Sequence, residues 1–97
     1  MNQAGIHEAV LEEIRTLAKA NHIQKVILFG SRARGDFHRT SDIDLAVSGG
    51  DVLRFSLDVE EKTSTLLTYD VVNLGKPLSR EFLEAIQNEG IVLYEEV

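Results

Sequence analysis

Apolar side chains recur every three or four positions in three stretches of the chain, which is the spacing of one buried helical face. The first predicted helix covers residues 7–20. The second and third begin after Asp51 and Ser79, which are both residue types that cap helix N-termini. We expect Gly90 to close the third helix as its C′ residue.

Four shorter runs, rich in β-branched and aromatic residues, predict strands. They cover residues 24–29, 43–47, 68–74 and 91–94. The first run contains an unbroken apolar stretch over residues 26–29, as expected of a central strand, and the last run is expected at a sheet edge. These elements predict an α/β fold, with a small mixed sheet, in a single domain over residues 1–97.

The second predicted strand alternates in polarity, so its two faces have different environments. Its apolar positions, Ile43, Leu45 and Val47, are expected to face the helices. Asp42, Asp44 and Ala46 then share the other face, which must stay open to a ligand. We therefore predict helices packed on one face of the sheet and a functional site on the other.

Asp42 and Asp44 would repel each other strongly, by about 4 kcal/mol at ~4 Å and an effective dielectric constant of ~20. A divalent cation offsets this repulsion, and hard oxygen ligands without Cys or His favour Mg²⁺ or Mn²⁺ over zinc. Gly30 and Ser31 directly follow the first strand, where main-chain N–H groups can approach a phosphate. Ser31 is expected to cap a short helix whose positive end faces the same anion.

The composition describes an ordinary globular protein of 97 residues, 43% hydrophobic and 27% charged, without cysteine. We expect a cytoplasmic protein with no membrane-spanning segment, since no apolar run is long enough. The net charge of −6 argues against direct binding of nucleic acid. Arg32, Arg34 and Arg39 nevertheless form a local basic group that suits a polyphosphate such as ATP, although a solvated loop face is the plainer interpretation without the flanking motif.

The order Gly30, Ser31, ten residues, Asp42 and Asp44 resembles the signature of the DNA polymerase beta nucleotidyltransferase superfamily. The surrounding LFGSRARG and SDIDLAV segments resemble its minimal nucleotidyltransferases, the small antitoxin partners of HEPN toxins. In that family a third carboxylate stands on a later strand, and Asp70 is the position that matches it. A carboxylate is also disfavoured by strand propensity there, which favours a functional role.

The resemblance implies a Mg²⁺-dependent enzyme that transfers a nucleoside monophosphate from a nucleoside triphosphate to an acceptor hydroxyl. The expected monophosphate is AMP. Catalysis and metal binding would fall to Asp42, Asp44 and Asp70, and nucleotide binding to a second set: Gly30, Ser31, Arg32, Arg34 and Arg39. The expected acceptor is a tyrosine of a HEPN partner. Two alternatives stay open: an antitoxin that acts by contact alone, and the catalytic subunit of a small-molecule nucleotidyltransferase.

Overall fold

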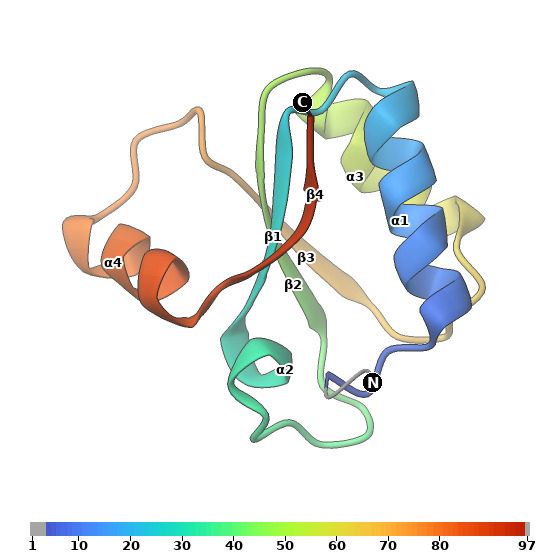
Figure 1. Ribbon diagram of the computed structural model, residues 1–97, viewed down its shortest axis with the longest axis horizontal. Coiled ribbons are helices and arrows are strands. Elements are labelled where there is room, and N and C mark those ends of the chain that lie inside the picture. Colours follow the sequence, from blue (N-terminus) through green and yellow to red (C-terminus); the bar gives the residue numbers. More distant parts are fainter. Residues whose placement is uncertain (1–3, 97) are drawn as a thin grey trace.

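The protein forms a four-stranded mixed sheet with four helices, as shown by a computed structural model that describes residues 4–96 (Figure 1). The elements follow one another as α1 (Glu8–Ala20), β1 (Lys25–Phe29), α2 (Gly30–Arg34), β2 (Ile43–Ser48), α3 (Val52–Lys62), β3 (Tyr69–Asn73), α4 (Arg80–Glu89) and β4 (Ile91–Glu95). The predicted α/β class is therefore confirmed. No helix among the described residues is long and apolar enough to cross a bilayer.

The sheet has the strand order β3-β2-β1-β4, so β1 is central and β4 lies at an edge, as predicted. β1 runs antiparallel to both β2 and β4, whereas β2 and β3 are parallel. A parallel pair needs a crossover connection, and α3 provides it between β2 and β3. This pairing places the start of β2 and the start of β3 beside the end of β1.

One face of the sheet is covered by α1 and α3, which lie next to each other in Figure 1. The alternation predicted for β2 holds for its three inward side chains, which are fully buried in the main hydrophobic core. The prediction is wrong for Ala46, which was expected on the open face and is fully buried as well. That core also contains Ile14 of α1 together with Phe55 and Val59 of α3, all with no exposed surface. Burial of these side chains, at about 1.5–3 kcal/mol each, holds the two helices on the sheet.

The fourth helix lies apart from α1 and α3 and contacts α2 and β1 (Figure 1). Phe82 of α4 packs edge-to-face on Phe29, with ring centroids 5.5 Å apart and an interplanar angle of 85°. Phe29 alternates with the buried core residues of β1, so its ring lies on the opposite face of the sheet. α4 therefore borders the face on which the sequence predicts the functional site.

The helix ends are mostly as predicted. Asp51 accepts a hydrogen bond from the Arg54 N–H at 3.0 Å, and Ser79 accepts one from the Phe82 N–H at 3.1 Å. Gly90 ends α4 as predicted, although with a φ of −69° and not in a left-handed conformation. Glycine is required there by close packing instead, because a Cβ would lie 2.4 Å from the Ile86 carbonyl oxygen.

The cap predicted at Ser31 is also wrong. α2 begins one residue earlier, at Gly30, and is preceded by Phe29 without a side-chain cap. The short helix ends at Gly35, which adopts a φ of 93° as predicted for a stop residue. Ser31 thus lies inside the first turn rather than before it.

Candidate active site

The sheet register brings together residues that lie far apart in the sequence. Asp44 of β2 is directly opposite Asp70 of the parallel strand β3. On its other side Asp44 is opposite Phe29, the last residue of β1, which leads directly into Gly30. The glycine–serine turn and two of the three predicted aspartates therefore meet where β1 ends and β2 and β3 begin.

Gly30 has a backbone conformation and a neighbour that exclude any side chain. Its φ is 75°, in the region that favours glycine. A Cβ at this position would lie 2.2 Å from Oδ2 of Asp44. The absence of a side chain thus lets the main chain at the start of α2 approach the Asp44 carboxylate closely, so that a phosphate on the turn would also be near this acid.

The fold disfavours the ionised form of Asp44. Partial burial is the main cause that raises the pKa of its carboxyl, and the negative charges of Asp70 and then Asp42 raise it further. Arg34 and Arg32 act in the opposite direction without cancelling these effects. A half-buried carboxylate beside two others is destabilised in its ionised form by burial and by charge repulsion. A bound divalent cation would offset both effects.

Asp42 and Asp70 are more exposed than Asp44. Asp42 lies just before β2, and its Oδ1 accepts a hydrogen bond from the hydroxyl of Thr68. Within residues 4–96, no group of three or more His, Asp and Glu side chains is arranged to hold a metal ion. The donor set still suits Mg²⁺, which is usually bound by one or two carboxylates and completed by water and substrate phosphates.

Arg32 occupies a position that the sequence did not indicate. Its side chain is 2% exposed, and its guanidinium lies over the Phe37 ring, 4.8 Å from the centroid. The guanidinium donates to main-chain carbonyls at 2.9–3.5 Å, and these belong to Ala4, Gly5, His38, Arg39 and Ser41. This burial lowers the pKa of Arg32. Arg32 thus holds the loop before Asp42 in place, and its contact with a nucleotide stays a prediction.

The other two arginines are exposed. Arg34 forms ion pairs at 3.3 Å with Asp36 and with Glu89 of α4, and these carboxylates raise its pKa. Arg39 forms no ion pair with any residue of the described part of the chain. Both side chains remain available to a ligand at the surface, and their nucleotide-binding role stays a prediction.

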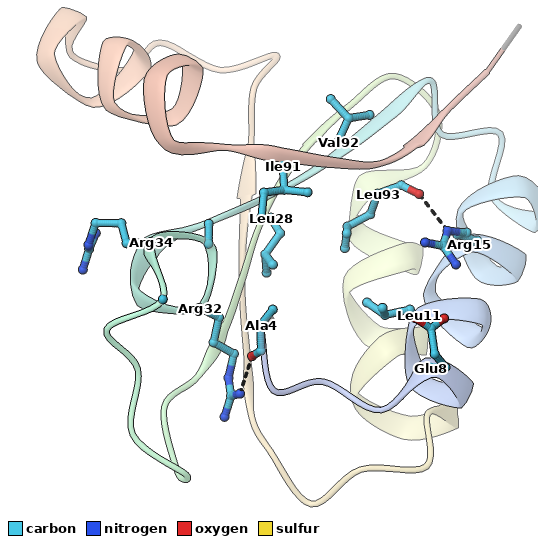
Figure 2. A pocket seen from close by; sticks show the side chains of 12 residues that line it. Ala4, Glu8, Leu11, Arg15, Leu28, Arg32, Arg34, Ile91, Val92 and Leu93 are labelled. Atoms are coloured by element: carbon cyan, nitrogen blue, oxygen red, sulfur yellow. Dashed lines mark hydrogen bonds between the residues drawn. The ribbon is translucent and has the colours of Figure 1, made fainter. Parts of the chain in front are cut away.

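A cavity of about 350 Å³ lies elsewhere, between α1, α2 and β4 (Figure 2). Leu11 and Leu28 point toward its centre, and Arg15 at its rim donates to the Leu93 carbonyl at 2.9 Å (Figure 2). None of the three aspartates lines this cavity. The candidate active site therefore lies outside this cavity, where β1 ends and β2 and β3 begin.

Comparison with known proteins identifies a family for this arrangement. The sequence profile of the polymerase beta nucleotidyltransferase family matches residues 12–97. A protein of Methanocaldococcus jannaschii described as a candidate protein adenylyltransferase, MJ0604, is 33% identical, over 90% of this chain and 97% of its own length. These matches confirm the resemblance drawn from the Gly30 to Asp44 motif.

Two solved structures share the fold. One is a toxin–antitoxin complex with AMP-PNP, 28% identical with a TM-score of 0.69, covering 89% of this chain and 73% of the other. The second is a variant of the MntA toxin–antitoxin complex, 26% identical with a TM-score of 0.68 and the same coverage. Both likenesses extend over most of the sheet and its helices.

Proposed function

Because the chain belongs to the polymerase beta nucleotidyltransferase family, we propose that it transfers AMP from ATP to a hydroxyl group of a partner protein. The observation that supports this most directly is the contact between Gly30 and Asp44, with Asp70 opposite. Nucleotidyl transfer requires a phosphate site beside paired carboxylates, and this contact supports such an arrangement. Adenine is proposed because MJ0604 is described as an adenylyltransferase.

Each site residue has a distinct proposed task. The main-chain N–H groups at Gly30 and Ser31 hold the terminal phosphates of ATP, with added charge from Arg34 and Arg39 at the surface. Asp42, Asp44 and Asp70 would hold Mg²⁺. A bound Mg²⁺ supplies neutralisation of the negative charge that develops on the triphosphate.

Asp70 accepts the proton of the acceptor hydroxyl. The acceptor oxygen then forms a bond to the α-phosphorus as the bond from that phosphorus to the bridging oxygen breaks. Pyrophosphate leaves with the bonding electrons, and AMP remains on the acceptor. Asp70 suits this role because it is exposed and lies directly opposite Asp44.

The proposed partner is a HEPN-type ribonuclease toxin, and the proposed acceptor is one of its tyrosines. The support is the likeness to toxin–antitoxin assemblies, one of them with AMP-PNP. The charge of this chain is −6, which favours encounter with a basic, RNA-binding protein rather than with nucleic acid itself. An antitoxin acting by contact alone is the second candidate, because no three acidic side chains within residues 4–96 are already arranged around a metal site.

Intact-mass spectrometry of the partner after incubation with ATP and Mg²⁺ distinguishes these functions. We expect a gain of one or more adenylyl units with the wild-type chain and none with Asp42→Ala. Formation of a tight complex without any mass change would refute the enzymatic proposal and support neutralisation by contact.

A further inference from the structure

Thr68 lies beside the carboxylates although it belongs to no recognised part of the motif. It immediately precedes β3, as Asp42 immediately precedes β2. The Ile43 N–H donates to the Thr68 carbonyl oxygen at 2.9 Å, which fixes the main chain of Thr68 next to the start of β2. The register pairs Asp44 with Asp70 and then Ile43 with Tyr69, and one residue further outward Thr68 comes to lie across from Asp42.

The two cross-strand positions differ in chemistry. Asp44 is opposite another acid, and the charges of Asp70 and Asp42 raise its pKa. Asp42 instead meets a hydroxyl, whose oxygen donates to Oδ1 of the carboxylate. A hydroxyl carries one proton, so it restrains one carboxylate oxygen and leaves Oδ2 open to another ligand.

Without this hydrogen bond, Asp42 would be an exposed side chain free to change rotamer. Threonine is well suited to restrain it, since branching at Cβ limits its own χ1. Hydrogen bonds to carboxylates that bind metals commonly set their orientation, and their loss typically reduces metal affinity or activity by about 10–100-fold.

We infer that Thr68 is a positioning residue, which orients the Asp42 carboxylate for the divalent cation that accompanies the nucleotide. This inference rests on the proposed function, and it extends the site by one residue outside the glycine–serine and aspartate motif. Thr68 provides a hydrogen-bond donor across from Asp42. An acid at this position would instead add a like charge and repel the Asp42 carboxylate.

Calorimetric titration of the full chain with a non-hydrolysable ATP analogue, at a series of Mg²⁺ concentrations, tests the role. Thr68→Val and Thr68→Ala remove the hydroxyl and should raise the Mg²⁺ concentration needed for half-maximal nucleotide binding by about 10–100-fold. Nucleotide affinity at saturating Mg²⁺ should change little. Thr68→Ser keeps the donor and should recover most of the wild-type behaviour.

Thr65→Val is the matched control. Thr65 lies in the same loop, and its hydroxyl accepts a hydrogen bond from the Leu67 N–H at 3.1 Å without touching an acid. Its loss should leave the Mg²⁺ requirement at the wild-type level. A wild-type Mg²⁺ requirement in both Thr68→Val and Thr68→Ala would overturn the role of Thr68 alone, whatever their unfolding free energies. Binding of nucleotide by wild-type protein equally well with and without Mg²⁺ would overturn the proposed metal site and this inference with it.

Discussion

Substitution of Gly30 by alanine should separate the backbone requirement of the turn from its functional requirement. Gly30 and Gly35 lie at the two ends of α2, with φ values of 75° and 93°. Alanine at either position adopts an unfavourable left-handed conformation, which costs about 1–2 kcal/mol. The added methyl group meets nothing within 4 Å at Gly35, whereas at Gly30 it would lie 2.2 Å from Asp44 Oδ2.

The magnitude of the second effect follows from this contact. Ordinary carbon–oxygen contacts require well over 3 Å, so the Asp44 carboxylate must move by about 1 Å or turn to another rotamer. A misplacement of about 1 Å in a reacting group can reduce the rate by about 10²-fold. We therefore expect both variants to lose similar stability and only Gly30→Ala to lose adenylyl transfer by about this factor.

Two measurements on both variants test the reasoning. Urea denaturation should give losses of about 1–2 kcal/mol each, out of the 5–15 kcal/mol that is typical of a folded domain. Single-turnover transfer to the partner should then be near the wild-type rate for Gly35→Ala and strongly reduced for Gly30→Ala. Equal transfer rates in the two variants would show that the approach of Gly30 to Asp44 is not needed for the reaction.

Four further substitutions address two carboxylates, the buried arginine and an exposed arginine as its control. Asp44→Asn should abolish transfer. Its unfolding free energy at pH 7 should stay level or rise by up to about 1 kcal/mol, because the substitution removes a charge disfavoured in the folded state. A large loss of unfolding free energy in urea denaturation would instead assign Asp44 a structural role. Asp70→Asn should slow single-turnover transfer more than it weakens nucleotide binding, and an unchanged rate would remove Asp70 from the mechanism. Arg32→Ala should lower the unfolding free energy by more than about 2 kcal/mol, since several buried carbonyls lose their donor. Exposed Arg39→Ala should stay within about 0.5 kcal/mol of wild type, and equal losses for the two arginines would contradict this account.

The local features of this protein were predictable because they depend on residues close together in the sequence. Alternation along residues 43–47 indicated which face of β2 is buried, and the three inward side chains are indeed fully buried. The caps at Asp51 and Ser79 depend on hydrogen bonds that span three residues. The family likewise follows from one continuous motif, from Gly30 to Asp44.

The cap predicted at Ser31 was wrong, and Gly90 ends its helix without a left-handed conformation, because packing determined both positions. The turn at Gly30 takes a positive φ that brings the main chain against Asp44, and α2 begins there. Gly90 does not adopt a positive φ. A glycine is required there because the Ile86 carbonyl oxygen leaves no room for a side chain. In both cases glycine was recognised as special, but the reason lay in a neighbour rather than in the local pattern.

The tertiary structure alone decided which side chains face the acids before and on β2, including Asp70, which the resemblance had already indicated. Asp70 lies opposite Asp44 only because β2 and β3 pair in parallel with this register, and no local pattern encodes that pairing. The same register places Thr68 against Asp42. Burial of Arg32 depends on carbonyls contributed by separate segments of the chain. The sequence by itself determined the elements, the family and the acids before and on β2, because periodicity and motif spacing are local; the partners of those acids depend on contacts across the sheet, which exist only once the chain has folded.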